Sequence, residues 1–134
     1  MNGRTFGRAG EDIAEAYLKK KGYRIVARNY NTAHGELDVV AIKGLTLVFV
    51  EVKAKSTARY GPPAKELTYG KRAHLRVAAA EFCKVDASGR RVPVYIGPFR
   101  FTRPYRRLRF DLIELLMRDG VAERIVYTKN AFRA

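Results

Sequence analysis

Apolar residues are concentrated in two runs in the middle of the chain, at 37–42 and 47–52. Both lie in the stretch from Gly35 to Lys53, GELDVVAIKGLTLVFVEVK, and Lys43-Gly44-Leu45 is the expected turn between them. Nearly continuous apolar runs of this length are typical of strands that are covered on both faces of a sheet. The pattern therefore predicts two central strands joined as a hairpin.

The remaining periodicity predicts helices on either side of this hairpin and further strands after the second helix. Helical spacing is expected at residues 8–21 and 68–84, with Thr68 as an N-cap, and strand patterns at 23–30, from Val92, at 110–116 and at 124–128. Phe132 is expected to pin the C-terminal tail to the core. Because no linker, repeat or low-complexity tract interrupts the chain, we predict one domain over 1–134.

Charged residues interrupt the two central runs. Asp38 lies in the first run, Glu51 and Lys53 lie at the end of the second, and Glu36 stands at the entrance to the first. Alternate residues of a strand point to the same face, so Glu51 and Lys53 share a face. If the strands are antiparallel neighbours, Asp38 lies level with both. Since ionised groups are costly to bury without partners, the pattern predicts a polar site built into the sheet.

Two carboxylates beside an amine suit a specific chemistry. Carboxylate oxygens are the ligands that Mg²⁺ and Mn²⁺ prefer. Such a cation polarises a phosphodiester and ionises a water molecule, while an adjacent lysine orients the water or offsets developing charge. The sequence therefore predicts a site for phosphodiester hydrolysis. The alternative is an exposed hairpin face with ordinary ion pairs, in which Glu51 pairs with a neighbouring lysine.

The net charge narrows the class of partner. The chain has 27 Lys and Arg against 13 Asp and Glu, which gives a net charge of +14 and a pI near 10.3. Such a field attracts polyanions, and nucleic acid is the leading candidate because phosphate contacts supply most sequence-independent affinity. Excess arginine that only raises solubility is the alternative. A membrane partner is not expected, since no helix combines a dense basic face with a bulky apolar one.

Several cations are candidates for contact with nucleic acid. They are Lys55, Arg59, Lys71, Arg100, Arg103, Arg106 and Arg107. The four arginines lie among Phe99, Phe101 and Tyr105, a composition that suits partly unstacked nucleic acid. A twisted edge hairpin with arginines facing water is the alternative. Lys71 is near an expected helix N-terminus, which favours anions, although it is also explained as an ordinary exposed lysine.

Four other residues have simple structural explanations. Glu11 and Asp12 early in the first helix, with lysines late, complement the helix dipole. His34 is expected in a solvent-facing loop. The single cysteine, Cys83, is expected to fill helix volume in a reducing cytoplasm, and the first residues carry no secretory signal. The expected location is therefore cytoplasmic.

These motifs together carry a resemblance to a known family. The chain resembles the bacterial YraN-like family of uncharacterised proteins, within the PD-(D/E)XK restriction-endonuclease-like superfamily that includes archaeal Holliday junction resolvases. The matching segments are RAGEDIAEAYLKKKGYRIVARNY, GELDVVA, LVFVEVKAKS, YGPP with Thr68 and Lys71, FDLIEL and NAF. Leu37 stands where the superfamily label has proline, a variation that does not touch the chemistry.

The resemblance implies a fold and a set of site residues. It implies a restriction-endonuclease-like α/β core, in which a mixed central sheet is flanked by helices. It also implies Asp38, Glu51 and the carbonyl of Val52 as metal ligands and Lys53 as the catalytic lysine. Glu11 falls where resolvase-like members place a helix carboxylate near the metal, which favours an active-site role over the dipole explanation. Glu36 is either an outer carboxylate of the site or the partner of an arginine.

The expected function is a Mg²⁺- or Mn²⁺-dependent endonuclease that acts on DNA, with branched or structured DNA as the class that the resemblance suggests. A noncatalytic module that binds DNA or RNA on a nuclease fold is the alternative, since fold alone does not establish activity. A third reading is a basic protein bound to ribosomal or messenger RNA, with the acidic cluster serving only fold stability. A symmetric homodimer is a further expectation, because resolvase-like enzymes cut two strands.

Overall fold

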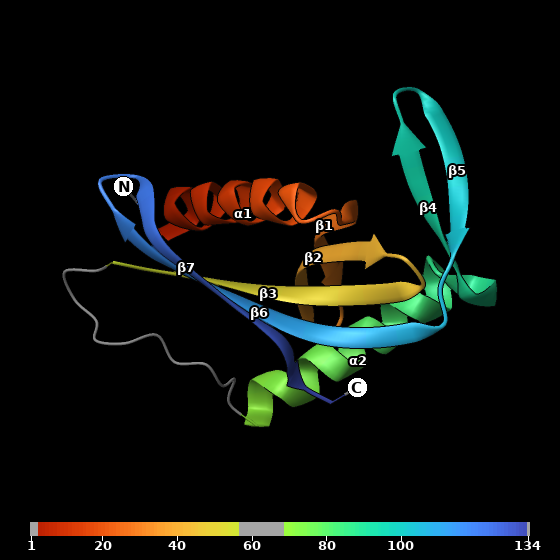
Figure 1. Ribbon diagram of the computed structural model, residues 1–134. Coiled ribbons are helices and arrows are strands. Elements are labelled where there is room, and N and C mark those ends of the chain that lie inside the picture. Colours follow the sequence, from red (N-terminus) through yellow and green to blue (C-terminus); the bar gives the residue numbers. More distant parts are fainter. Residues whose placement is uncertain (1–2, 57–68, 134) are drawn as a thin grey trace.

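A five-stranded mixed sheet forms the centre of the protein (Figure 1). The computed structural model describes residues 3–56 and 69–133, with side chains from residue 8 onward. The helices are α1 (Gly3–Lys20), α2 (Tyr69–Val85) and the 3-10 turn η1 (Ser88–Arg90), and the strands are β1 (Arg24–Thr32), β2 (Gly35–Lys43), β3 (Thr46–Ser56), β4 (Arg91–Ile96), β5 (Phe99–Pro104), β6 (Arg107–Arg118) and β7 (Val121–Phe132). The sheet order is β1-β2-β3-β6-β7, and only the β3–β6 pair is parallel among these described strands.

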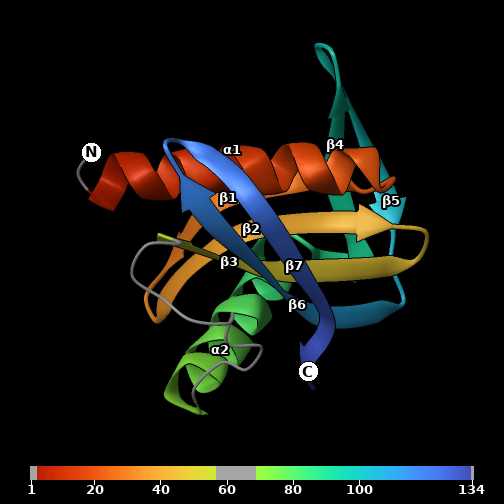
Figure 2. The same ribbon diagram turned by 60° about the vertical axis from the view of Figure 1, so that its left-hand side comes forward.

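The two helices cover opposite faces of this sheet, which gives three layers (Figures 1 and 2). On the α1 face, Leu18 packs with Val39 and Val48 in one buried cluster. On the α2 face, Phe82 packs in a second cluster and makes an edge-on contact with Phe49, with ring centroids 5.9 Å apart. The prediction from the two central apolar runs, a hairpin covered on both faces, is confirmed.

The element boundaries depart from the sequence prediction in two places. The first helix begins at Gly3 instead of residue 8, because residues 3–7 are helical without carrying an apolar stripe that periodicity could detect. The last strand spans Val121–Phe132 instead of 124–128, because its pairing with β6 contains register shifts that break the alternation of side chains. Phe132 is buried and stacks on Phe110 at 4.5 Å, so it is fixed to the core as expected, but as part of a strand.

A third departure concerns the arginine-rich segment. We expected either a nucleic-acid contact or a twisted edge hairpin with arginines facing water. The segment does form a hairpin, but β4 and β5 make a two-stranded sheet of their own. This hairpin projects from the end of the central sheet on the side of α1 (Figures 1 and 2). Its base is joined to the core through buried Val92 and Val94 and through Tyr105, whose hydroxyl donates to the Ala87 carbonyl at 3.0 Å. Tyr105 is therefore a core residue, not a ring available to bases.

A polar network is buried under β7. The Asp111 carboxylate is 1% exposed and accepts hydrogen bonds from Arg109 Nε at 2.9 Å and from the Asn130 backbone N–H at 3.0 Å. The Tyr127 hydroxyl also donates to this carboxylate, and the Tyr23 hydroxyl lies 3.1 Å from that of Tyr127. The network joins β6 and β7 to Tyr23 in the turn between α1 and β1, so it fixes the end of the helix against the sheet.

The close approach of α1 to β3 depends on Gly10. A Cβ at this position would lie 3.1 Å from the Cβ of Ala54, which is fixed to a strand and has no rotamer to change. We expect Gly10→Ala to lower the free energy of unfolding by about 1 kcal/mol, despite the better helix propensity of alanine. Urea denaturation would measure it, with Gly70→Ala in open space at the start of α2 as the matched control. Equal stability changes in the two variants would contradict the account.

Among the helices that the structure describes, none is long and apolar enough to cross a membrane.

Candidate metal centre

Strands β2 and β3 separate at the point where the charged residues lie. Their antiparallel pairing runs from Lys43–Thr46 to Val39–Val50 and stops there. The next residues, Asp38 and Glu51, would form the following pair, so the two carboxylates lie level as the sequence predicts. Asp38 Oδ2 accepts a hydrogen bond from the Val52 N–H at 2.9 Å. The Asp38 carboxylate thus serves as the acceptor for a β3 backbone N–H beyond the last backbone pair of the two strands.

The two carboxylates are close together and poorly hydrated. Glu51 is 7% exposed, and its Oε2 is buried without a hydrogen-bond partner among the described residues. Burial, the charge of Glu51 and a hydrogen bond with it raise the pKa of Asp38 to about 7, although the Val52 N–H and Lys71 favour the ionised form. Two carboxyl groups held in this way repel each other when both are ionised, and a cation relieves the repulsion.

Part of that neutralisation comes from α2. Lys71 Nζ lies 3.1 Å from Glu51 Oε1, in a salt bridge between the first turn of α2 and the middle of β3. The sequence assigned Lys71 to a backbone phosphate, and the structure places its ammonium on a site carboxylate. The alternative from the sequence, an exposed hairpin face on which Glu51 pairs with a lysine, therefore holds in one part only. Glu51 does form an ion pair with a lysine, but it is buried and does not lie on an exposed face.

A second carboxylate group surrounds Asp38. Glu11, Glu36 and Asp38 each offer an oxygen within 4.8 Å of the other two. Glu11 comes from the middle of α1, because the helix begins eight residues earlier, so the helix-dipole explanation of Glu11 was wrong. Burial and the charge of Asp38 raise the pKa of Glu11. Arg28 of β1 lies 3.7 Å from Glu11, 2.8 Å from Asp12 and 3.4 Å from Glu15, and balances this acidic flank.

The residues present fit a divalent cation. Asp38 and Glu51 supply carboxylate oxygens, the Glu51 Oε2 is buried and unsatisfied among the described residues, and Glu11 and Glu36 extend the oxygen set. Hard cations such as Mg²⁺ and Mn²⁺ take ligands of this kind and retain several waters. Val52 follows Glu51 on β3, beyond the last β2–β3 pair, and its carbonyl is the backbone ligand that the sequence resemblance implies.

Lys53 is half-buried and stands two residues after Glu51 on the same face of β3. Its register partner on β6 is Glu114, a carboxylate that is fully buried and that the sequence reasoning did not single out. Glu114 Oε2 forms an ion pair with Lys55 Nζ at 3.5 Å. The other carboxylate oxygen, Oε1, is buried without a hydrogen-bond partner among the described residues. An acidic residue inside the apolar run RFDLIELL is the same signal that identified Glu51, and it would have found Glu114.

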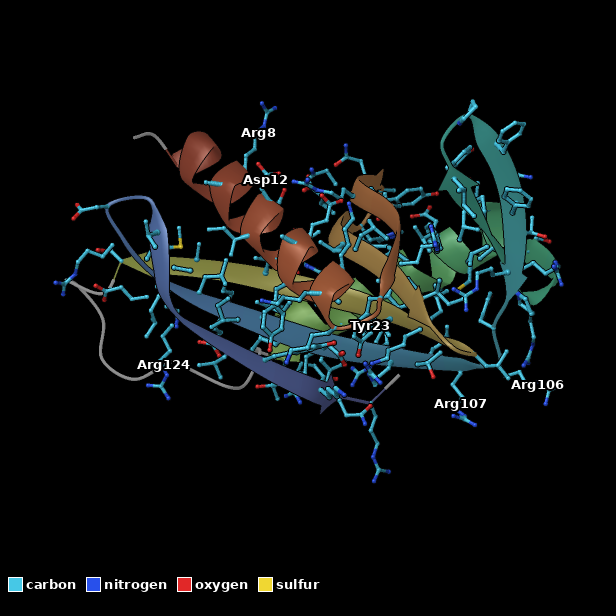
Figure 3. The ribbon with its side chains drawn as sticks, turned by 45° about the horizontal axis from the view of Figure 1, so that its top comes forward. Arg8, Asp12, Tyr23, Arg106, Arg107 and Arg124 are labelled. Atoms are coloured by element: carbon cyan, nitrogen blue, oxygen red, sulfur yellow. The ribbon has the colours of Figure 1, made fainter. Side chains whose placement is uncertain are left out.

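The other predicted nucleic-acid contacts lie in two separate regions. Lys55 is on β3 near the carboxylates, and Arg59 is outside the described residues. Arg100, Arg103, Arg106 and Arg107 are on or beside the hairpin, at the opposite end of the sheet (Figure 3). Arg107 pairs with Thr46, the first residue of β3. Glu51 is five residues further, about 17 Å along the strand at ~3.3 Å per residue.

The raised pKa of Asp38 makes the stability of the metal-free protein depend on pH. The folded protein holds this proton up to about pH 7, whereas an unfolded aspartate releases it near 3.8. Stability is therefore expected to fall as pH rises through this window. Asp38→Asn should be more stable than the wild type at pH 8 by on the order of 1 kcal/mol, after allowance for partial exposure, and the difference should vanish near pH 4. Thermal denaturation in EDTA at the two pH values measures it, and a difference that does not change with pH would contradict it.

Comparison with known proteins gives the family. Residues 10–115 match the model of the uncharacterised protein family UPF0102. The chain belongs to this family. It is 36% identical over 129 residues to a UPF0102 protein from Syntrophomonas wolfei, which covers 96% of this chain and 98% of the relative. A UPF0102 protein from Desulfosudis oleivorans is 39% identical over 129 residues, covering 96% and 90%, and one from Rhodococcus jostii is 35% identical over 128 residues, covering 96% of each.

The family result confirms the YraN-like resemblance of the sequence. The UPF0102 match covers α1 from Gly10, the diverging strands β2 and β3, and most of β6, including Glu114. The mixed five-stranded sheet with a helix on each face is also compatible with the restriction-endonuclease-like core that was expected. The match ends at residue 115, so β7 and its contacts with Asp111 lie outside it.

Proposed function

We propose that this UPF0102 protein is a metal-dependent endonuclease that hydrolyses phosphodiester bonds in DNA. The observation that carries the proposal is that the β2–β3 pairing stops after Val39–Val50, where the Asp38 carboxylate lies level with the buried carboxylate of Glu51 and interacts with it. This arrangement supports membership of the PD-(D/E)XK superfamily and the similarity to Holliday junction resolvases that the sequence suggests. Branched DNA is accordingly the substrate class to test first.

Each residue of the site has a role in this proposal. Asp38, Glu51 and the Val52 carbonyl would hold Mg²⁺ or Mn²⁺, which when bound lowers the pKa of water and stabilises charge on the leaving oxygen. Lys53, on the same face as Glu51, positions the attacking water or donates to a phosphate oxygen. The Val52 N–H keeps Asp38 in place through its 2.9 Å hydrogen bond. Glu11 and Glu36 adjust the negative charge around Asp38.

The charge of the protein supports nucleic acid as the substrate. A net charge of +14 draws a polyanion to the surface and offsets the local negative field of the carboxylates. Lys55 and Lys71 lie beside buried site carboxylates, at 3.5 Å from Glu114 and 3.1 Å from Glu51. We therefore expect both ammonium groups to contact phosphates of a strand that is bound at the site. A homodimer, which would allow two strands to be cut together, remains part of the proposal, and sedimentation that shows only monomer with cutting intact would remove it.

One observation favours a second candidate, a noncatalytic module that binds nucleic acid. Lys71 and Arg28 already form ion pairs with Glu51 and Glu11, so these carboxylates are partly neutralised without any cation. In this case the carboxylates stabilise the fold and the basic surface alone binds the ligand. The candidates differ in one respect: binding by the module does not depend on Mg²⁺ or Mn²⁺.

The test is cleavage of end-labelled duplex, single-stranded, flap and four-way-junction DNA with Mg²⁺ or Mn²⁺, beside an EDTA control. The nuclease proposal expects cutting that requires the metal, and the ranking of substrates identifies the preferred DNA structure. Calorimetric titration with Mn²⁺ alone should show binding to the wild type and not to Asp38→Asn. If the protein binds DNA tightly, cuts none of the substrates and takes up no Mn²⁺, the nuclease proposal is wrong and the binding module replaces it.

A further inference from the structure

The β4–β5 hairpin exposes four large apolar side chains near its turn. Tyr95, Ile96, Phe99 and Phe101 are 60%, 53%, 66% and 51% exposed. They are carried on an element that projects away from the body of the protein (Figures 1 and 2). Clustered exposure of this kind marks an interaction surface more often than a neutral patch.

The hairpin register places rings on both of its faces. Ile96 pairs with Phe99 and Val94 pairs with Phe101, so these side chains share the face whose base is buried in the core. Tyr95 pairs with Arg100 on the other face. A ring directly opposite a guanidinium is an arrangement that binds a planar base and its phosphate at adjacent positions.

The charge of this segment identifies the kind of ligand. Residues 88–107 contain six arginines and no aspartate or glutamate. A second copy of the chain would carry the same charge to the contact, so self-association through the hairpin is opposed by repulsion. A polyanion with exposed rings, an unpaired nucleic-acid strand, matches both the charge and the apolar surface.

A cavity lies between the hairpin and the corner formed by α1 and β1. It has a volume of about 650 Å³, and its lining includes Glu15, Lys19, Tyr23, Arg24, Tyr95 and Arg103. Its one carboxylate, Glu15, is already paired with Arg28 at 3.4 Å and with Lys19 at 3.9 Å. The cavity thus combines cations with the Tyr95 ring, as grooves that bind single strands do.

We propose that the β4–β5 hairpin and this cavity form a binding site for an unpaired strand of nucleic acid. The strand crosses the end of the hairpin, with one base stacked on Tyr95 on the face that it shares with Arg100 and another on Phe99 on the opposite face, and Arg100 and Arg103 bind its phosphates. The site deepens the proposed function and rests on it only for the choice of nucleic acid as ligand. In this proposal the hairpin recognises unpaired nucleotides of a branched or gapped substrate. This binding site is separate from the carboxylates that would hold the metal.

The test measures binding without metal, by fluorescence anisotropy in EDTA. The probes are a labelled oligothymidine of about 16 nucleotides, near the upper site size of single-strand binding domains, and a duplex of the same length. Tyr95→Ala with Phe99→Ala should weaken binding of the oligothymidine by about tenfold or more and change duplex binding much less. Both side chains are exposed, so thermal denaturation should show an unchanged fold.

The arginine contribution has a matched control at the other end of the sheet. Arg100 and Arg124 are both exposed, and Arg124 lies near the β6–β7 turn, far from the hairpin (Figure 3). Arg100→Gln should reduce the slope of log affinity against log salt for the oligothymidine by about 0.7, the value for one phosphate contact on a single strand. Arg124→Gln removes the same charge and should leave the slope unchanged.

Each outcome decides the inference separately from the nuclease proposal. Wild-type affinity in the Tyr95 and Phe99 double variant, or equal effects of the Arg100 and Arg124 substitutions, would overturn it even if the protein cleaves DNA. Self-association that the double variant abolishes would overturn it too, because a second copy would then be the occupant. Loss of single-strand binding in the double variant supports it whether or not cleavage is observed.

Discussion

Replacing Glu51 with glutamine is expected to lower metal-dependent DNA cleavage by about 100-fold or more. Glutamine keeps the size of the side chain but supplies one neutral oxygen where Glu51 has two charged ones. The buried Oε2 of Glu51 and its neighbour Asp38 are the centre of the oxygen set, so the loss falls on the site itself. Rates of cleavage on the preferred substrate, measured with saturating Mn²⁺, give the effect.

The matched control is Glu123→Gln. Glu123 forms an exposed pair with Arg118 at 3.0 Å on the hairpin of β6 and β7, away from the carboxylates. The control makes the same chemical change and the same change in net charge, and should retain wild-type cleavage. Nucleic-acid binding in EDTA should persist in both variants. Cleavage by Glu51→Gln at the rate of the control would exclude Glu51 from the reaction.

Removing the Asp111 carboxylate is expected to destabilise the fold by about 3–5 kcal/mol. Asp111→Ala leaves the Arg109 guanidinium, the Tyr127 hydroxyl and the Asn130 N–H without their shared acceptor in a region with little water. An arginine stays protonated over the whole pH range of such an experiment, so in the variant Arg109 does not escape the penalty by losing its proton. Urea denaturation in EDTA measures the loss independently of any activity.

A graded series separates the charge from the hydrogen bonds. Asp111→Asn keeps one acceptor oxygen for the Asn130 N–H and should cost less than the alanine variant, although it loses the charged pair with Arg109 and the acceptor of the Tyr127 hydroxyl. Glu123→Ala breaks an exposed ion pair and should change stability by less than about 1 kcal/mol. An Asp111→Ala protein as stable as Glu123→Ala would show that the network is not a source of stability.

The sequence predicted the two central carboxylates of the candidate site, but not the contacts that the helices make with them. Asp38 and Glu51 were found because acids inside apolar strands are conspicuous and because a hairpin has only one simple register. The salt bridge of Lys71 with Glu51 was not found, since it joins α2 to β3 across a segment whose path local pattern does not determine. Glu11 was first explained by a predicted helix start at residue 8, which is five residues later than the start at Gly3.

The sequence by itself determined the central hairpin, the faces of the two helices, the pair of carboxylates and the basic character of the protein. Those features depend on the periodicity and charge of residues that are close together in the sequence, so they can be recognised from short segments of the chain. Only the tertiary structure decided that Glu36 joins Glu11 and Asp38, that Glu114 is buried opposite Lys53, and that β4 and β5 leave the main sheet. These contacts join elements distant in sequence, and packing of the whole chain, not local preference, selects among them.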